Sequence, residues 1–181
     1  MTDLIVVTGP PGAGKTTVAR ALVAGFELSA LIAGDDFFAF VDRGFVPPWT
    51  PEAHQQNDIV IQAAPAAAGR FVAGGYAVVY DGVVGPWFLE TFTAWTGLND
   101  LQYLVKYLVL LPSEQRCLER VQARIGHGFT DLDATRHMHR QFAEASVDPR
   151  HVMTDPDQEP EAVAASIREL TVRGSLVHEQ R

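Results

Sequence analysis

Residues 9–16 carry glycines, a lysine and a threonine in a pattern that is typical of loops that bind phosphate. They match GxxxxGK[ST] and stand between an apolar, strand-like run and a helical pattern. Backbone N–H groups at a helix start converge on a phosphate, and because the two prolines have none, we expect the donors within Gly12–Thr17. Lys15 would bridge the β- and γ-phosphates of a nucleotide, and the Thr16 hydroxyl would bind magnesium. The predicted nucleotide-binding residues of this loop are Gly9, Gly12, Ala13, Gly14, Lys15, Thr16 and Thr17.

Carboxylates follow two of the apolar runs that predict strands. A Gly-Asp-Asp sequence at residues 34–36 comes after the second run, and a Tyr-Asp-Gly sequence at residues 80–82 ends the third. Ligands of open parallel α/β sheets bind at the carboxyl ends of the strands, so these side chains are expected at one site. Phosphoryl transfer to a hydroxyl needs a carboxylate that takes the proton, and magnesium needs one beside the threonine of the loop. We assign Asp35 the first role, with Asp36 as its neighbour or substitute, and Asp81 the second; the alternative is that Asp35 or Asp36 caps a helix that starts at Phe37.

Three arginines recur at intervals of four residues in a helix predicted over residues 114–125. Arg116, Arg120 and Arg124 therefore share one face, opposite an apolar stripe. Like charges at this spacing repel, so the arginines are either left in solvent or held toward an anion, which here would be the transferring phosphate. The anion interpretation is favoured for Arg120 and Arg124, and the solvent interpretation for Arg116. Glycines that follow the stripe are able to act as hinges, which predicts a small lid at about residues 125–135.

Aromatic side chains are concentrated after both proposed aspartates. Five lie between residues 37 and 50 together with a single arginine, and two more, Trp87 and Phe88, follow Asp81. Several must belong to the core, while the rest would line an apolar acceptor pocket with few polar groups. Such a pocket suits an alcohol with an apolar or aromatic body better than a polyol, whose hydroxyls would be left unpaired. The predicted substrate-binding residues are Asp36, Phe37, Arg43, Trp49, Asp81 and Trp87.

Apolar runs alternate with helical patterns along the chain, and this alternation predicts the fold class. Buried strands are expected at residues 4–8, 27–33, 76–80 and 103–111, with a short fifth strand at 151–154. Helices are expected at residues 16–24, 52–73, 86–95, 114–125, from about 133 to 145, and from about 160 onward. The order predicts an α/β fold with a parallel sheet and helices on both faces, in a single domain over residues 1–172. We expect residues 173–181 to be a frayed tail.

The composition limits the classes of protein to which the chain can belong. It has 181 residues, of which 47% are hydrophobic, enough for one domain with a sizeable core. The formal net charge of −8 offers no basic field for a nucleic-acid backbone, and no apolar run approaches the ~18 residues of a membrane span. Cys117 is the one cysteine, which excludes a disulfide framework. The sequence shows no targeting segment, so we expect a cytoplasmic protein with neither nucleic acid nor membrane as partner.

Together these motifs resemble the small-molecule kinase branch of the P-loop proteins, which includes gluconate kinase, shikimate kinase and chloramphenicol phosphotransferase. Residues 119–127 are similar to the RxxxRxGH stretch that opens the gluconate kinase lid, and residues 152–155 are similar to a turn near the adenine. The resemblance implies a three-layer P-loop NTPase fold with a five-stranded nucleoside-monophosphate-kinase-like core, and ATP and Mg²⁺ as cofactors. It also implies that Arg120 and Arg124 are lid arginines and that Asp155 lies beside the nucleotide.

Residues 34–37 are similar to another part of this branch. They resemble the Asp-containing element of chloramphenicol phosphotransferase, polynucleotide kinase and zeta toxins, in which the Asp is the base, and this favours Asp35 over Asp36. Gluconate kinase continues with an acidic-plus-arginine run, which is absent from residues 37–49. The sequence therefore argues against gluconate as the acceptor.

We thus expect an ATP- and magnesium-dependent kinase with an alcohol group as acceptor, in which Lys15, Asp35, Arg120 and Arg124 are catalytic. The alternatives are an antibiotic-inactivating O-phosphotransferase and a nucleotide-binding switch ATPase whose slow hydrolysis controls a partner. An acceptor-sized cleft beside Asp35 would favour the kinase, and a closed surface there would favour the switch.

Overall fold

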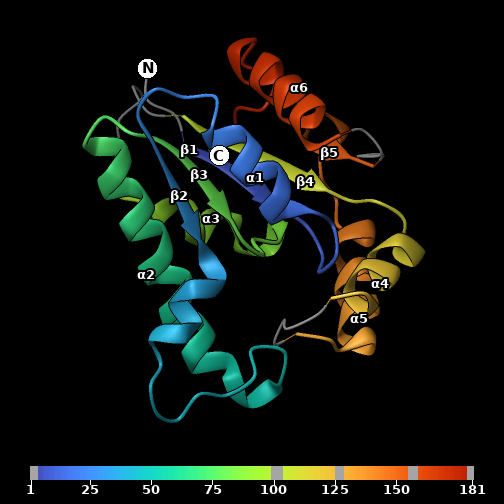
Figure 1. Cartoon of the computed structure of the whole chain (residues 1–181). Helices are drawn as coiled ribbons and strands as arrows, with labels where there is room; N and C mark the ends of the chain where they lie inside the picture. The colour runs from blue at the N-terminus through green and yellow to red at the C-terminus, as the bar shows by residue number, and fades with distance from the viewer. Residues whose placement is uncertain (1–3, 99–103, 125–128, 155–158, 179–181) are drawn as a thin grey trace.

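The computed structural model describes residues 4–98, 104–124, 129–154 and 159–178 of the chain. Five parallel strands form one sheet in the order β2-β3-β1-β4-β5 (Figure 1). Their bounds are Leu4–Thr8 (β1), Ser29–Ala33 (β2), Ala77–Asp81 (β3), Val105–Leu110 (β4) and Val152–Met153 (β5). The predicted α/β fold with a five-stranded parallel sheet is confirmed. β1 lies at the centre, so the loop after it is flanked by the carboxyl ends of β3 and β4.

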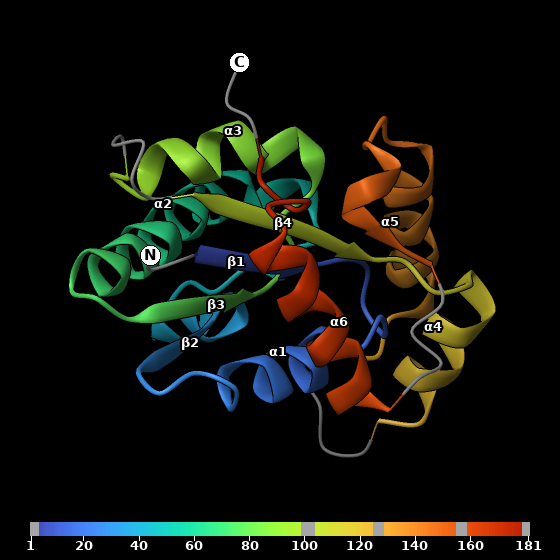
Figure 2. The same ribbon diagram turned by 90° about the horizontal axis from the view of Figure 1, so that it is seen from above.

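Helices cover both faces of the sheet and complete three layers (Figure 2). One face carries α1 (Lys15–Val23) and α6 (Pro160–Val172), and the other carries α2 (His54–Ala73) and α3 (Pro86–Trp95). A further pair, α4 (Glu114–Gln122) and α5 (Leu132–Glu144), follows β4. Short 3-10 helices are η1 (Gly34–Phe40), η2 (Pro51–Ala53) and η3 (Pro149–His151). Among the described residues, no helix is both long and apolar enough to cross a bilayer.

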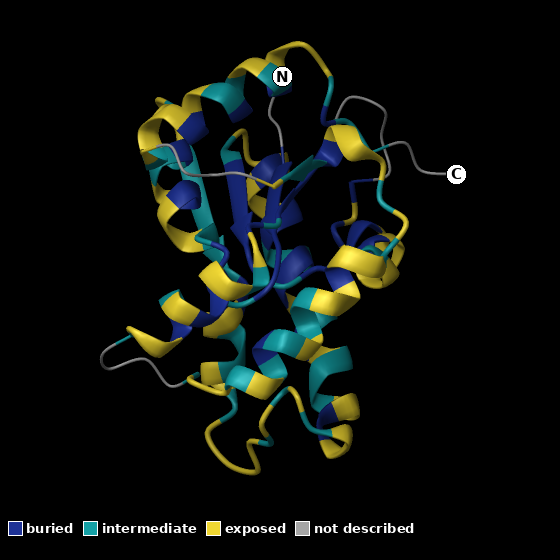
Figure 3. Cartoon of the chain, turned by 90° about the vertical axis from the view of Figure 1, so that its right-hand side faces the viewer, coloured by how far each residue is buried: buried dark blue, intermediate teal, exposed yellow. Residues whose placement is uncertain are grey.

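The central strand β1 explains why the first predicted run is continuously apolar. Leu4 and Val6 are buried in the core that includes α2 and α3, whereas Ile5 and Val7 are buried in the core that includes α1 and α6. Successive side chains of a strand point to opposite faces, so a strand covered by helices on both faces needs apolar residues throughout. Figure 3 shows the strands buried between helices whose outward faces are exposed. These two cores fix the strand ends at which the candidate site lies.

The region around the second strand differs from its predicted bounds. β2 begins two residues later than expected, at Ser29, and its side chains are only partly buried because it is an edge strand that pairs with β3 alone. The helix expected from Phe37 is instead the 3-10 helix η1, which begins at Gly34 directly after β2. Asp35 and Asp36 therefore lie within the first turn of η1 rather than ahead of a helix.

The region of the predicted lid also differs from its expected bounds. α4 ends at Gln122 rather than at residue 125, so that Arg124 lies just beyond the helix. Residues 125–128 of the predicted lid lie outside the described residues, and its last part, from Leu132, is the first turn of α5. The side chain of Asp131 caps α5 by accepting from the N–H of Ala134 at 2.9 Å, which fixes where that helix begins.

Residues after α6 fold back onto the sheet, so the prediction of a frayed tail from Arg173 is wrong as far as His178. Leu176 is fully buried, and its carbonyl accepts a hydrogen bond of 3.0 Å from the N–H of Tyr107. The N–H of His178 donates to the carbonyl of Val105 at 2.9 Å. The segment is too short to carry a periodic hydrophobic signal. Its position is set by the backbone hydrogen-bonding groups that β4 offers.

His151 is buried beside this contact and is held as a neutral imidazole. Its Nδ1 lies 3.0 Å from the carbonyl oxygen of Tyr107, and its Nε2 lies 3.2 Å from Nε of Arg150. Because a guanidinium only donates, Nε2 accepts and Nδ1 donates its proton to the carbonyl. Burial lowers the pKa of His151; the carbonyl of Tyr107 and the charge of Asp148 oppose this, and Arg150 adds to it. Burial and the neighbouring His151 also lower the pKa of His178.

We therefore expect the free energy of unfolding to fall as the pH drops through about 6.5, the ordinary pKa of histidine. The folded pKa values lie below those of the unfolded chain, so the unfolded state takes up protons first, and stability present above that pH is lost on acidification. His151→Asn, which keeps a donor for the carbonyl of Tyr107, should flatten this dependence, whereas His137→Gln on the exposed face of α5 should not. Urea unfolding between about pH 8 and pH 5 measures the free energy of unfolding of the wild type and of both variants. An unaltered pH dependence in His151→Asn would contradict the assignment.

Candidate active site

The phosphate-binding loop between β1 and α1 has a backbone that glycine alone accommodates at several positions. Gly9, Gly12 and Gly14 have φ values of 141°, 82° and 95°. A Cβ on Gly9 would clash with the carbonyl of Leu110 at the end of β4, and a Cβ on Gly12 would clash with the carbonyl of Cys117 in α4. The loop is thus packed backbone against backbone on two elements, which fixes its position in the fold.

The amino end of α1 is free of any side-chain cap. Its cap residue is Gly14 in the left-handed conformation, and this position makes no side-chain cap hydrogen bond. The first N–H groups have no acceptor within the helix, and with the positive end of the helix dipole they suit an anion. Within the loop, the N–H of Ala13 donates to the carbonyl of Pro10 at 3.2 Å. One of the predicted donors is therefore used by the loop itself.

Lys15 brings together predicted catalytic groups from separate segments. Its Nζ donates to the carbonyl of Pro10 at 3.1 Å. Burial lowers the pKa of Lys15, and the carboxylates of Asp35 and Asp81 oppose this shift, while Arg124 adds to it. Three predicted residues from three other segments of the chain are therefore within electrostatic reach of Lys15.

Asp81 ends β3 and is almost completely buried, with 6% of its surface exposed. Burial raises the pKa of Asp81, and the hydrogen bond from the Thr16 hydroxyl and the charge of Lys15 oppose this. The turn after Asp81 is tied to β1, because the hydroxyl of Thr8 accepts from the N–H of Val84 at 2.8 Å. A hydroxyl and a carboxylate side by side supply the oxygen donors that Mg²⁺ prefers, so Thr16 and Asp81 fit the predicted metal.

Asp35 and Asp36 lie in the first turn of η1 with exposed side chains. Neither caps it, because the cap residue is Ala33 and the helix has no side-chain cap hydrogen bond. The carboxylate of Asp35 acts on the pKa of Lys15 and of Asp81. Asp35 is therefore within electrostatic reach of the lysine of the phosphate-binding loop.

Tyr80 belongs to the surroundings of the site and was not predicted. A Cβ on Gly34 would clash with its hydroxyl, so this tyrosine requires glycine at the start of η1. Burial raises the pKa of Tyr80, and the charges of Asp35 and Asp81 raise it further. The apolar pattern predicts Tyr80 only as part of a buried strand. Its position one residue before a strand-end aspartate was the available signal, because a buried tyrosine hydroxyl needs polar surroundings.

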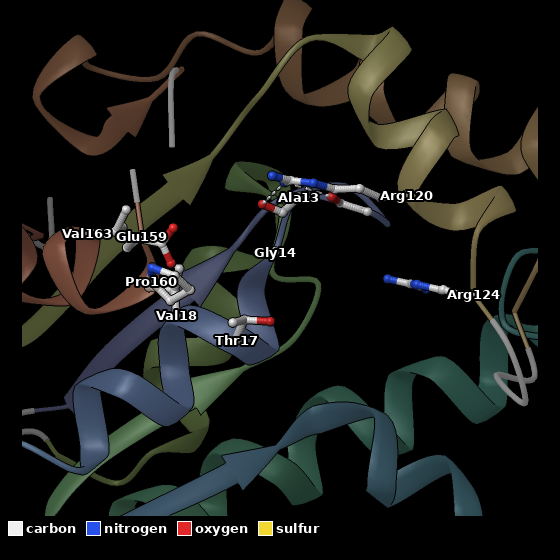
Figure 4. A pocket seen from close by; sticks show the side chains of 10 residues that line it. Ala13, Gly14, Thr17, Val18, Arg120, Arg124, Glu159, Pro160 and Val163 are labelled. Carbon is white, nitrogen blue, oxygen red and sulfur yellow. Dashed lines mark hydrogen bonds between the residues drawn. The ribbon is translucent and has the colours of Figure 1, made fainter. Parts of the chain in front are cut away.

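A cavity of about 420 Å³ lies beside the phosphate-binding loop (Figure 4). Arg120 and Arg124 reach into it from α4 and from the segment after it, whereas Arg116 is exposed and does not line it. Nη1 of Arg120 lies 3.4 Å from the carbonyl oxygens of both Gly12 and Ala13, which holds α4 against the loop. The cavity is lined by Gly12, Ala13, Gly14, Thr17, Val18, Arg120, Arg124, Glu159, Pro160 and Val163.

The amino end of α6 supplies the side of this cavity across from Arg124, through Glu159, Pro160 and Val163 (Figure 4). These residues were not predicted, because no motif marks them and they reach the loop only through the return of the chain after β5. Asp155, which the resemblance implies for this side, lies outside the described residues.

Phe37, one of the predicted acceptor residues, lines a second cavity, of about 480 Å³, between η1 and α2. Its ring packs edge to face on that of Phe40 with centroids 5.2 Å apart. Residues three apart share a face in a 3-10 helix, so these rings point to a different side of η1 from Asp35. The residues that line this cavity include neither Asp35 nor Lys15. It is therefore separate from the groups that gather around the phosphate-binding loop.

The other predicted acceptor residues differ in their contacts. Arg43 is exposed in the connection after η1. In the same connection, Trp49 packs against Phe129, with ring centroids 4.9 Å apart. Trp87 folds over the backbone of the turn that precedes α3 and packs on Phe142 of α5, with centroids 5.4 Å apart. Trp87 thus joins α3 to α5, and Trp49 reaches the segment after the arginines.

The sequence profile of a known family matches most of the region that builds this site. It is that of the AAA domain, and the match covers residues 4–149, more than half of the chain. The chain belongs to the AAA domain family. Among curated protein sequences, none matches it.

Several solved structures share the fold of this AAA domain chain. The Deinococcus radiodurans tunicamycin resistance protein matches with a TM-score of 0.64 and 15% identity, over 99% of this chain and 100% of that one. A putative kinase from Chloroflexus aurantiacus matches with 0.65 and 18%, over 93% and 97%. A gluconokinase from Sinorhizobium meliloti matches with 0.59 and 21%, over 96% and 97%. At these identities the likeness concerns the fold, and the expected P-loop kinase fold is confirmed.

In this AAA domain chain, we expect Lys15→Ala to weaken ATP binding by about 10- to 100-fold. A hydrogen bond to a charged group is worth about 1.5–3 kcal/mol, and each 1.4 kcal/mol is about tenfold in affinity. Titration calorimetry on the folded variants measures it, with Arg70→Ala on the exposed surface of α2 as the control. An unchanged ATP affinity of the folded Lys15→Ala variant would contradict nucleotide binding at this loop.

Proposed function

We propose that the chain is an ATP- and magnesium-dependent kinase that transfers the γ-phosphate to a hydroxyl of a small molecule. The observation that carries the proposal is the position of Asp35. Its carboxylate is exposed, makes no cap, and acts electrostatically on both the lysine of the phosphate-binding loop and the buried Asp81. A carboxylate at this place suits a general base that meets the acceptor beside the γ-phosphate.

In the proposed reaction, the acceptor oxygen forms a bond to the γ-phosphorus while the bond from that phosphorus to the β–γ bridging oxygen breaks. Asp35 takes the hydroxyl proton, and ADP leaves. Thr16 and Asp81 would hold Mg²⁺, which supplies positive charge to the phosphates when bound. Lys15, Arg120 and Arg124 stabilise the negative charge that spreads over the transferring group. The cavity between the arginines and the amino end of α6 has the residues to take the rest of the nucleotide.

Both alternative functions use the same loop and differ in the fate of the γ-phosphate once the nucleotide has bound. Phosphorylation of an antibiotic would be the same reaction with a particular acceptor. A nucleotide-binding switch would hydrolyse ATP at a rate that does not depend on an alcohol, and it would have no use for a base beside Lys15. A screen of alcohols, sugars and antibiotics for phosphate transfer from ATP separates the three functions.

The first kinetic prediction concerns the base. Asp35→Asn should keep ATP affinity and lower kcat by about 10²–10⁴-fold, since an amide cannot take the proton that a positioned base takes. Asp36→Asn should have the smaller effect, and Asp42→Asn in the exposed loop after η1 is the control. Steady-state rates and ATP titrations of the three variants decide it. A larger loss in Asp36→Asn than in Asp35→Asn would assign the base to the neighbouring residue.

The second kinetic prediction concerns the arginines. Arg120→Ala and Arg124→Ala should each lower kcat by more than they raise KM for ATP, because charge spreads over the transferring group only in the transition state. Arg116→Ala removes the same side chain from the position that does not line the cavity, and is the matched control. Steady-state kinetics and thermal unfolding of all three variants measure the effects. If Arg120→Ala and Arg124→Ala lose stability but keep normal kinetics, both arginines have a structural role instead.

A further inference from the structure

Val84, in the turn between β3 and α3, has both of its backbone polar groups bonded to side chains of other strands. Its N–H donates to the hydroxyl of Thr8 at 2.8 Å, and its carbonyl accepts from the hydroxyl of Tyr107 at 2.8 Å. Thr8 ends β1, and Tyr107 lies within β4. In Figure 2, β1 lies between β3 and β4. The two anchoring hydroxyls, of Thr8 and Tyr107, therefore tie the turn after β3 to both of the strands beyond it.

The anchoring hydroxyls and the peptide groups that they bond are shielded from water. Thr8 and Val84 are fully buried, and Tyr107 is 1% exposed. Burial raises the pKa of Tyr107, so its hydroxyl keeps the proton that it donates. A buried peptide group that lost either partner would have no water to replace it, and an unpaired buried group is costly. Solvent therefore offers no substitute for either bond.

Asp81 lies where the paired part of β3 ends and this turn begins. Its backbone is in register with Val7 of β1 and with Ala33 of β2. The N–H of Gly82 donates to the carbonyl of Val7 at 3.4 Å, and the anchored residue, Val84, follows two residues later. The chain at Asp81 is therefore fixed on one side by the sheet and on the other side by the anchoring hydroxyls.

The position of Asp81 matters because of what its carboxylate contacts. It accepts a hydrogen bond from the hydroxyl of Thr16, the other oxygen donor that suits the metal. Mg²⁺ requires nearly octahedral geometry with short bonds to oxygen, so it tolerates little displacement of a ligand. The loss of a residue that orients a metal ligand typically lowers metal affinity by about 10- to 100-fold. A turn that is free to shift would thus weaken the metal site although both donors remain.

We propose that Thr8 and Tyr107 are positioning residues for the magnesium site. They act through the backbone of Val84 and hold the carboxylate of Asp81 beside the hydroxyl of Thr16. The inference rests on the proposed function, since it takes the carboxylate and the hydroxyl as the oxygen donors for Mg²⁺. It gives a role to two buried hydroxyls that lie outside the phosphate-binding motif.

A purely structural role for the anchoring hydroxyls leads to a different expectation. Thr8 directly precedes Gly9 of the phosphate-binding loop, so a general loosening at this point would weaken ATP binding with or without metal. A positioning role confines the loss to the metal, because the contacts of the loop with α4 and with the end of β4 stay in place. The two roles are therefore separated by the ATP affinity in the absence of Mg²⁺.

The first test needs no turnover. Calorimetry measures ATP affinity in EDTA, and then Mg²⁺ affinity by titration of Mg²⁺ into the ATP complex, with protein in excess so that little ATP is free. Thr8→Val and Tyr107→Phe should each weaken Mg²⁺ binding by about tenfold or more and leave ATP affinity in EDTA within about twofold. Thr8→Ser, which keeps the hydroxyl, should bind Mg²⁺ like the wild type. Thr93→Val is the matched control, because it removes a buried hydroxyl that bonds a carbonyl within α3.

The second test uses double variants to show whether the anchoring hydroxyls act through Asp81. Asp81→Asn should weaken Mg²⁺ binding at least as much as Thr8→Val, and the addition of Thr8→Val to it should cause no further loss. Thr8→Val/Tyr107→Phe should lose less than the product of the two single effects, because both hydroxyls bond the same residue. Effects that multiply independently in both double variants would contradict the proposal.

The outcomes separate this inference from the proposed function. If Thr8→Val and Tyr107→Phe bind Mg²⁺ like Thr93→Val, or lose ATP affinity in EDTA by the same factor as Mg²⁺ affinity, the positioning role is overturned and the kinase proposal stands. If Mg²⁺ binding depends on both hydroxyls but no alcohol is phosphorylated, the kinase proposal fails and the positioning role stands. A wild-type protein that takes up no Mg²⁺ with ATP overturns both.

Thermal unfolding of each variant shows which of them are folded. If Thr8→Val does not fold, Tyr107→Phe decides the outcome by itself, because it removes one oxygen atom and keeps the ring that packs in the core.

Discussion

The close approach of the phosphate-binding loop to the end of β4 and to α4 is the constraint on which the rest of the site depends. Side chains at Gly9 and Gly12 would occupy the space of the backbone carbonyls of Leu110 and Cys117. Their absence lets α4 lie directly on the loop, so that Arg120 bonds its carbonyls. Burial raises the pKa of Cys117 to about 11, so the sulfur beside the loop stays a neutral thiol and adds no negative charge where phosphate would bind.

The association of Lys15, Asp35 and Asp81 results from rules that the sequence already contains. A glycine-rich loop between an apolar run and a helix predicts where phosphate binds, and parallel strands end at one edge of a sheet. The position of the carboxylates after two such runs, beside the loop, can therefore be predicted without any knowledge of side-chain packing. The fold class was predictable for the same reason, since it depends on the order of the elements and not on their exact bounds.

The parts that could not be predicted depend on geometry at element ends. A helix was expected from Phe37, whereas a 3-10 helix begins at Gly34, and its threefold period decides which aromatic rings point away from Asp35. Tyr80 approaches the site only because a glycine lies against its hydroxyl. Glu159 reaches the cavity beside the phosphate-binding loop through a return of the chain that no local pattern encodes. Such contacts arise from long-range packing, which the hydrophobic periodicity of a sequence does not indicate.

The segment after α6 affects how the edge of the sheet at β4 can interact with other chains. Within the residues that the structure describes, β5 pairs with β4 at Val109 and Leu110, which would leave the rest of that side of β4 with unsatisfied backbone groups. Open rows of this kind are templates on which further chains can add strands. Here Val177 forms an antiparallel bridge with Lys106, and its neighbours bond the flanking residues. Protection against edge-to-edge aggregation at β4 therefore falls to residues that take no part in the chemistry.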